Sequence, residues 1–148
     1  LLGETYSATR DGEATLTLVN PQGETETRAI NVNPDPTING RSVLFVPSDF
    51  HRHFISLFPG KQRSLGSIAA HACIVARGAA QGAVMNPYLW DVAAVGLILE
   101  RAGGGLFTLA SGEPIEMGRY LNGTRMPFCL AAANITSHAK FKPLLTRR

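Results

Sequence analysis

A single carboxylate stands at the start of the most apolar segment of the chain. Asp91 precedes residues 92–99, where only Gly96 interrupts an apolar run, and residues 103–105 are all glycine. Asp favours the start of a helix and Gly the residue after its end, so the pattern predicts a helix with Asp91 as its N-cap. The run is apolar on every side, which predicts a helix buried in a layered core. Asp91 is either a cap or a ligand for a hard metal ion, and its two oxygens can serve both roles.

A glycine followed by a hydroxyl residue forms a second candidate site. Gly66 and Ser67 come after an expected strand over residues 61–65 and before an expected helix over residues 68–77, which Gly78 ends. Glycine lets a ligand approach the backbone, and the first N–H groups of a helix are free to bind it. Ordinary capping by Ser67 explains the same residues, and the spacing does not decide between the two.

The remaining segments predict the scaffold that positions these residues. Residues 1–40 are expected to form antiparallel strands, with a hairpin turn at Asp11–Gly12 and a loop over residues 33–36. Residues 41–148 alternate strands with helices, the pattern of a layered α/β core, and no internal boundary divides the chain. The whole is therefore expected to be one domain. Further strands are expected over residues 42–46, 83–85, 106–110 and 127–133.

Two further helices are predicted from capping residues. Ser48 or Asp49 can begin a short helix with one apolar face, made of Phe50, Phe54, Leu57 and Phe58. Its His51 and His53 are two residues apart and point to different sides, which favours surface residues over a metal pair. Thr136 or Ser137 can cap a last helix. His71 falls inside the helix over residues 68–77 and is expected to be a core histidine with its hydrogen bonds satisfied.

Composition limits the class of protein. The chain has 148 residues, of which 45% are hydrophobic and 17% charged, and this is typical of a folded domain with a sizeable core. No apolar run reaches the roughly 18 residues of a membrane span. Cys73 and Cys129 lie in apolar patterns, which predicts buried thiols in a reducing compartment, hence a cytoplasmic location. Nucleic-acid binding is not expected, because much of the net charge of +3 lies in a solvated tail: Lys140, Lys142, Arg147 and Arg148.

The candidate residues fall within motifs that resemble a known family. Residues 90–94 followed by residues 102–104 closely resemble the second signature of the inositol monophosphatase family, and residues 63–70 and 75–78 match in order and spacing. The resemblance implies part of a five-layered αβαβα fold that hydrolyses phosphate monoesters with Mg²⁺. It further implies that Asp91 is a metal ligand and that Gly66, Ser67 and, less securely, Ser48 contact the substrate.

Departures from the family pattern qualify this expectation. The Glu-Glu pair and the Asp-Pro-x-Asp-Gly-Thr segment, which supply most metal ligands and the water-activating group, do not occur. The chain thus resembles the C-terminal half of a phosphatase, no catalytic residue is identifiable, and we expect negligible activity alone. Val84 stands where inositol-cleaving members place a glutamate that binds a substrate hydroxyl. The substrate is then an inositol phosphate, a sugar phosphate or a nucleotide-type phosphate, with inositol the least favoured.

Two functions from different classes remain open. The chain is either part of a Mg²⁺-dependent phosphomonoesterase or a catalytically silent module that pairs with another chain, such as a missing N-terminal half or a second copy. A trimmed or partial chain is expected, because the sequence starts at Leu1 without an initiator Met. Neither nucleic acid nor a membrane is an expected partner.

Overall fold

An antiparallel sheet opens the chain. The computed structural model describes residues 3–148, and its first three strands are β1 (Gly3–Ser7), β2 (Thr15–Val19) and β3 (Thr25–Ala29), paired in the order β1-β2-β3. The expected antiparallel scaffold is confirmed. Along β2, alternate side chains face the protein interior, and Leu16 is completely buried.

A mixed sheet of five strands forms the centre of the molecule. The strands of this sheet are β4 (Val43–Phe45), β6 (Lys61–Arg63), β7 (Gly82–Met85), β8 (Gly105–Thr108) and β9 (Cys129–Ala132). They lie side by side in the order β6-β4-β7-β9-β8. Strands β6, β4 and β7 are parallel, whereas β9 is antiparallel to both β7 and β8. The expected alternation of strands and helices is therefore confirmed.

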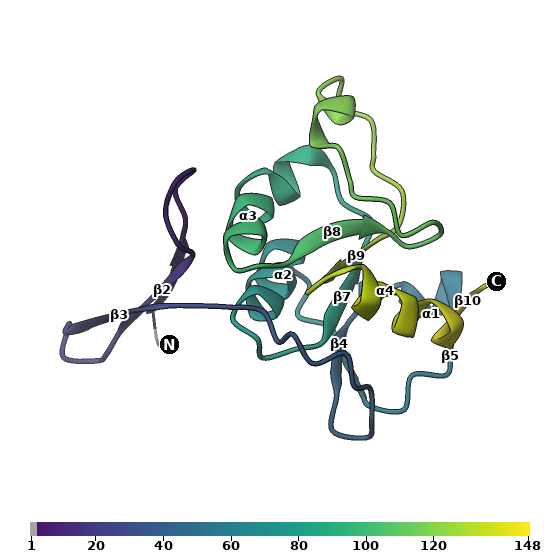
Figure 1. The fold of residues 1–148 in the computed structure, drawn as a ribbon, viewed down its shortest axis with the longest axis horizontal. Coiled ribbons are helices and arrows are strands. Elements are labelled where there is room, and N and C mark those ends of the chain that lie inside the picture. Colours follow the sequence, from purple (N-terminus) through teal and green to yellow (C-terminus); the bar gives the residue numbers. More distant parts are fainter. Residues whose placement is uncertain (1–2) are drawn as a thin grey trace.

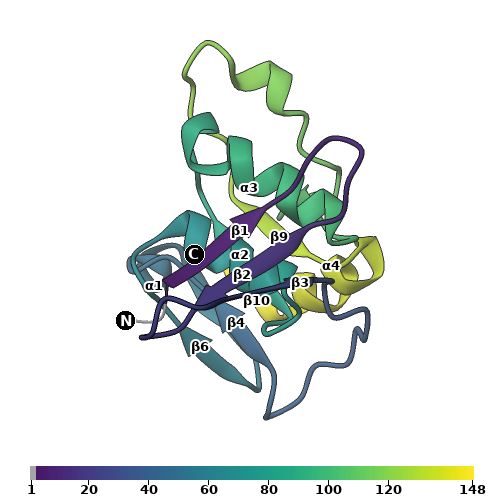
Figure 2. The same ribbon diagram turned by 90° about the vertical axis from the view of Figure 1, so that its left-hand side faces the viewer.

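The helices separate and cover the two sheets. They are α1 (Phe50–His53), α2 (Ile68–Ala76), α3 (Leu89–Arg101) and α4 (Ile135–Phe141), with short 3₁₀ helices at η1 (Met117–Tyr120) and η2 (Lys142–Leu144). From left to right in Figure 1 lie the three-stranded sheet, then α2 and α3, then the five-stranded sheet, and finally α4 and α1. Figure 2, which looks onto the three-stranded sheet, shows β1 and β2 in front of α2 and α3. The layered α/β architecture is confirmed.

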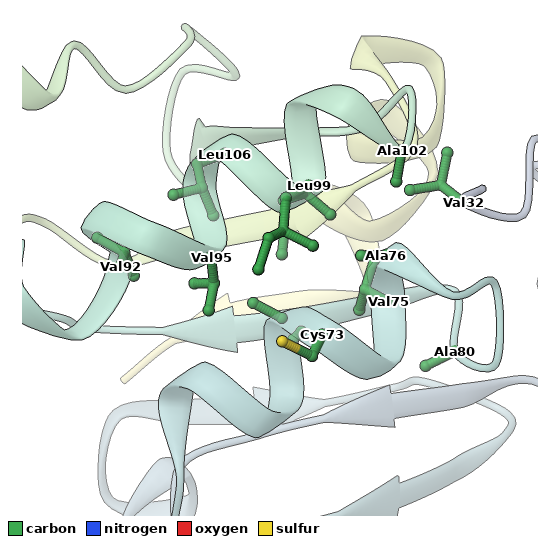
Figure 3. Packing of buried hydrophobic residues seen from close by; sticks show 14 of the residues in the cluster. Val32, Cys73, Val75, Ala76, Ala80, Val92, Val95, Leu99, Ala102 and Leu106 are labelled. Carbon is green, nitrogen blue, oxygen red and sulfur yellow. The ribbon is translucent and has the colours of Figure 1, made fainter. Parts of the chain in front are cut away.

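Two hydrophobic clusters fill the spaces on either side of the five-stranded sheet. The first joins α2 and α3 to the three-stranded sheet, and Figure 3 shows Val95 and Leu99 of α3 packing toward Cys73 of α2. The second lies beneath α4 and is rich in phenylalanine. Strand β7 serves both clusters, since Ala83 and Met85 point to the first and Val84 to the second. This alternation explains why every residue of β7 is buried.

The predicted helix after Asp49 is too long. Helix α1 ends at His53, and the chain continues as β5 (Phe54–Ser56), which pairs antiparallel with β10 (Leu145–Arg147). Leu57 was expected on a buried helical face but is 67% exposed. Pairing with a strand about 90 residues further along the chain overrides the local helical pattern, and sequence periodicity does not report such a contact.

Smaller corrections concern the last helix and the tail. Helix α4 is capped by Asn134 and not by Thr136 or Ser137, because the Asn134 side chain accepts the backbone N–H of Ser137. The four cationic tail residues are exposed as expected, although part of the tail is strand β10. No helix within residues 3–148 has both the length and the apolar character needed to cross a bilayer.

Both thiols are buried, as expected. Neither Cys73 nor Cys129 forms a disulfide, and burial raises the pKa of Cys73 to about 11 and that of Cys129 to about 12. A thiol reacts as its thiolate, so both side chains are unreactive core residues at neutral pH.

Candidate functional site

The candidate residues follow three neighbouring strands that run in the same direction. Ser48 comes after β4, Gly66 and Ser67 come after β6, and Asp91 comes after β7. The carboxyl ends of parallel strands meet at one edge of a sheet, and open α/β sheets bind ligands in the crevice outside that edge. The topology therefore places Ser48, Gly66 and Ser67 beyond the ends of two paired strands, and Asp91 follows β7, the other neighbour of β4.

A small cavity joins most of these residues. It has a volume of about 110 Å³, and its wall includes Ser48, Gly66, Ser67 and Val84. Ser64 and His71 also line it, and the hydroxyl oxygens of Ser48 and Ser64 are 3.2 Å apart. A wider hollow of about 350 Å³ shares Ser48 and Ser64 with the cavity, and Arg63 and His51 lie along it. Asp91 is not part of either lining.

Gly66 and Ser67 have the local geometry required both for ligand binding at the backbone and for helix capping by Ser67. Gly66 has φ of +72°, which favours glycine, and a Cβ placed there would meet no atom within 4 Å. The backbone at Gly66 is therefore open to a ligand. Ser67 is the N-cap of α2, and its hydroxyl oxygen accepts the backbone N–H of Ala70 at 3.2 Å. The capping reading of Ser67 is thus observed, and its side chain stands at the cavity wall as well.

Asp91 is not the N-cap of its helix. Helix α3 begins at Leu89 after the N-cap Tyr88, three residues earlier than expected, so Asp91 is the third helical residue. Its Oδ2 reaches back to accept the backbone N–H of Tyr88 at 2.8 Å. This is the return bond of a capping box, and it satisfies one N–H at the start of the helix. The second carboxylate oxygen is left for another partner.

Helix α3 is also not buried on all sides. Trp90 is 66% exposed, and Ala93 and Ala94 are exposed on the same part of the helix. The Trp90 ring stacks on Tyr88 with 4.5 Å between centroids, and the Arg125 guanidinium lies 5.3 Å from the centre of the Tyr88 ring. The prediction of a fully buried helix is wrong, because one face of the apolar run is left without a covering layer.

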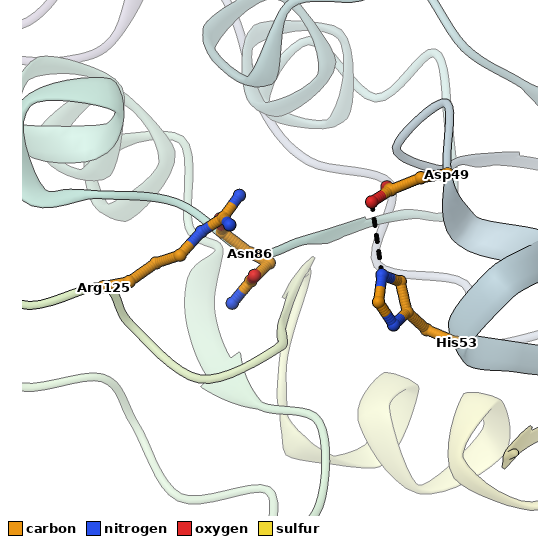
Figure 4. A network of polar contacts seen from close by, with 4 residues as sticks. All are labelled: Asp49, His53, Asn86 and Arg125. Carbon is orange, nitrogen blue, oxygen red and sulfur yellow. Dashed lines mark hydrogen bonds and ion pairs between the residues drawn. The ribbon is translucent and has the colours of Figure 1, made fainter.

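Hydrogen bonds fix the turn that carries β7 into α3. The Asn86 side chain donates to the carbonyl oxygen of Met126 at 2.6 Å, and Arg125 Nε donates to the carbonyl oxygen of Asn86 at 2.9 Å. Figure 4 shows Arg125 lying beside Asn86. These bonds hold the chain two residues ahead of Tyr88, and so help to set where Asp91 lies.

A separate ion pair lies in α1, on another part of this edge. His53 Nε2 is 3.2 Å from Asp49 Oδ2 (Figure 4), and this contact lowers the pKa of the Asp49 carboxyl below its ordinary value of 3.8. His51 is exposed and His53 is half-buried. Within residues 3–148, no three His, Cys, Asp or Glu side chains come together in a way that could hold a metal ion.

The residues present do not by themselves fit a Mg²⁺ site. Mg²⁺ requires near-octahedral oxygen ligation, commonly with more than one carboxylate. In the part of the chain that the structure describes, Asp91 has no neighbouring cluster of ligands to complete such a site.

Two residues of the site were not singled out from the sequence. Ser64 lies in the family-like run over residues 63–70, and that run was the signal available for it. His71 was expected to be a satisfied core residue. Its ring is buried, but its Nδ1 has no hydrogen-bond partner among residues 3–148.

Replacing Asp91 with alanine is expected to lower the free energy of unfolding by about 1 kcal/mol. The variant leaves the backbone N–H of Tyr88 without its acceptor and removes a negative charge from the positive end of the helix. Urea denaturation followed by circular dichroism measures the change. Glu100→Ala is the matched control: it removes an exposed carboxylate from the opposite end of α3, where we expect a change within about 0.5 kcal/mol. Equal losses in the two variants would contradict the capping role.

Fold and site together define a layered α/β protein with a small cavity, lined in part by serines, at the carboxyl ends of parallel strands. The sequence profile of the inositol monophosphatase family matches residues 2–146, and the chain belongs to that family. No curated protein sequence matches it significantly.

Solved structures agree with this assignment. SuhB from Mycobacterium tuberculosis is 19% identical, with a TM-score of 0.62 over 95% of this chain and 55% of that chain. The inositol monophosphatase from Anabaena (Nostoc) sp. PCC 7120 is 20% identical, with a TM-score of 0.59 over 88% of this chain and 56% of that chain. SaIMPase-II bound to inositol monophosphate is 16% identical, with a TM-score of 0.61 over 86% of this chain and 51% of that chain. The chain spans about half the length of these proteins.

Proposed function

We propose that the chain forms the substrate-side wall of a Mg²⁺-dependent phosphomonoesterase, of which it corresponds to the C-terminal half. The observation that carries this proposal is the common cavity of Ser48, Gly66 and Ser67, at the edge of the sheet where β7 leads into α3, the helix whose first turn contains Asp91. Membership of a family of phosphomonoesterases supports it. The hydroxyls and the open backbone at Gly66 suit hydrogen bonding to the non-phosphate part of a substrate.

Asp91 is the metal ligand that this chain contributes in the proposal. One of its oxygens holds the Tyr88 N–H, which fixes the carboxylate at the start of α3 and leaves the other oxygen for the metal. Asp91 would hold Mg²⁺ together with ligands from elsewhere, and the bound ion would supply charge neutralisation at the phosphoryl group and a water of lowered pKa. The other ligands and the water-activating group must come from residues outside the described part of the chain. We therefore expect no turnover by this chain alone.

We propose that the cavity favours a substrate that presents fewer hydroxyls than inositol to Val84. Val84 is completely buried and forms part of the cavity wall, where it offers no hydrogen bond. A site without a polar partner selects poorly for a hydroxyl. Structures of SaIMPase-II are described with inositol monophosphate and with 2′-AMP bound. Of these two classes, we propose that the chain suits the nucleotide-type phosphate or a sugar phosphate better.

Titration of the ¹⁵N-labelled chain with 2′-AMP and with inositol monophosphate, each with MgCl₂, tests the proposal. We expect shifts of the amide signals of Ser48, Gly66 and Ser67, stronger with 2′-AMP, and no phosphate release above the buffer rate. Loss of one hydrogen bond of about 1 kcal/mol predicts roughly fivefold weaker binding by Ser48→Ala.

Thr136→Ala is the matched control for this titration. It removes an exposed hydroxyl in α4, on the other face of the sheet, and binding should be unchanged. Shifts scattered over the surface, or equal losses in Ser48→Ala and Thr136→Ala, would contradict the proposal.

A catalytically silent binding or assembly module is the second candidate. The exposed Trp90 ring, stacked on the half-buried Tyr88 and next to Ala93 and Ala94 on α3, favours this candidate because such an apolar surface suits contact with a second polypeptide. A monodisperse monomer in analytical ultracentrifugation would count against pairing with a second copy. The two buried thiols support a cytoplasmic location as part of either proposal.

A further inference from the structure

The His71 ring lies directly beneath the segment that carries Gly66 and Ser67. His71 belongs to the second turn of α2, is 2% exposed, and stacks on Phe45 of β4 with 4.9 Å between ring centroids. Its Nε2 is 2.9 Å from the backbone nitrogen of Leu65, the residue before Gly66. The ring therefore connects the helix to the turn that precedes it.

This contact determines which ring nitrogen carries the proton. The backbone N–H of Leu65 is a donor, so Nε2 must accept with its lone pair, and the proton of the neutral ring is on Nδ1. Nδ1 has no hydrogen-bond partner within residues 3–148. A buried donor without a partner is unfavourable, so an apolar residue would serve better if packing were the function of this position. The advantage of histidine over an apolar residue at this position is therefore the hydrogen bond that it accepts from the Leu65 N–H.

We infer that His71 is a positioning residue for the substrate wall: by accepting the Leu65 N–H, it sets the backbone of Gly66 and Ser67. The inference rests on the proposed function for the role of Gly66 and Ser67. Gly66 has a positive φ and touches nothing on its open side, so neighbouring bonds must hold its conformation. One such bond is from Leu65 to the ring, and a second is from the Ala70 N–H to the Ser67 hydroxyl.

The bond exists only while the ring is neutral. A protonated imidazole is a donor at both nitrogens and cannot accept the Leu65 N–H. Burial lowers the pKa of His71 below its ordinary value of 6.5. None of the other ionisable side chains on α2, or on the elements packed against α2, is hydrogen-bonded to the His71 ring. These side chains are Glu4, Tyr6, Cys73, Arg77, Asp91, Glu100, Arg101 and Cys129. Arg63 and His51, which line the adjoining hollow, make no bond to the ring either.

The sign of the pH effect follows from this lowered pKa. The unfolded chain takes up a proton at His71 near pH 6.5, whereas the folded chain takes it up only at lower pH. Stability from the neutral ring is therefore complete above pH 6.5 and is lost as the pH falls below it. The amide signals of Leu65, Gly66 and Ser67 should move together when the folded ring becomes protonated.

Two variants and the wild-type chain test the inference by NMR. His71→Phe keeps a ring against Phe45 but has no acceptor, whereas His71→Gln places an amide oxygen near the position of Nε2. We expect hydrogen exchange at the Leu65 amide to be at least tenfold faster in His71→Phe and close to wild type in His71→Gln. The ring nitrogen spectrum of the wild type should show the proton on Nδ1. The pH-dependent movement of the Gly66 and Ser67 signals should be absent from His71→Gln.

Specific results would overturn the inference. A ring proton on Nε2, or Gly66 and Ser67 signals that do not respond to ionisation of His71, would contradict it. So would Leu65 exchange that is equal in all three proteins. If His71→Phe does not fold, the wild-type titration and His71→Gln still decide the question. None of these readouts uses a ligand, so a failure to bind 2′-AMP would count against the proposed function and leave this inference standing.

Discussion

Phe141→Ala is expected to remove about 3–5 kcal/mol from the free energy of unfolding. Phe141 is 1% exposed, it ends α4, and its ring stacks on Phe58 with 5.8 Å between centroids. The ring also lies against Gly82 of β7, where a Cβ would come within 3.1 Å of it. The missing side chain at Gly82 leaves the space that the ring fills. Loss of the Phe141 ring therefore opens a cavity that the rigid sheet cannot close.

This loss is large compared with the roughly 5–15 kcal/mol that stabilise a typical domain. Thermal and urea unfolding measure it, and the variant should lose the fixed packing of α4 on the sheet. Leu121→Ala is the control, because Leu121 is 78% exposed and its truncation should change stability by no more than about 0.5 kcal/mol. Comparable losses in the two variants would mean that α4 does not pack as described.

Gly60→Ala is the second large effect, expected at roughly 3 kcal/mol, the upper end of the range for overpacking. A Cβ at Gly60 would overlap the carbonyl oxygen of Ser42 and come within 2.9 Å of that of Asn39. Both are backbone atoms, so no flexible side chain can move aside. The same Ser42 oxygen accepts the backbone N–H of Lys61 at 2.8 Å, and this bond starts the pairing of β6 with β4.

The Gly60 variant also tests how the site is held. Because β6 ends just before Ser64, a displaced β6 should shift the amide signals of Ser64 and Ser67 as well as lower the midpoint of urea unfolding. Gly118→Ala is the matched control, since a Cβ at Gly118 would meet nothing within 4 Å and its φ is not positive. Normal stability in Gly60→Ala would show that the β4–β6 connection can relax.

Local signals in the sequence predicted the regular elements well where the contacts are local. Gly78 and Gly103 have positive φ and follow the ends of α2 and α3, as their positions after apolar runs indicated. Two of the errors share one cause. Helix α1 is cut short by the pairing of β5 with β10, and the start of α3 is set by the turn through Asn86, which Arg125 and Met126 hold. Each depends on a residue far along the chain.

For the candidate site too, some features could be predicted from the sequence and others depend on contacts between distant residues. The sequence motifs indicated Gly66, Ser67, Ser48 and Asp91 as candidates, and their roles stay predictions for the binding experiments. That Ser48 and Ser64 share a cavity with Val84, and that His71 holds Leu65, emerged only from the tertiary structure.

By itself, the sequence determined the type and order of most elements and the glycines that follow α2 and α3, because turn formation and periodic burial depend on near neighbours. The tertiary structure decided which strand ends meet, which face of α3 stays exposed, and which ring nitrogen of His71 accepts a bond. These depend on the order β6-β4-β7-β9-β8, in which strands far apart along the chain become neighbours. The sequence pattern does not specify that order, so the residues of the site become neighbours only when the sheet is assembled.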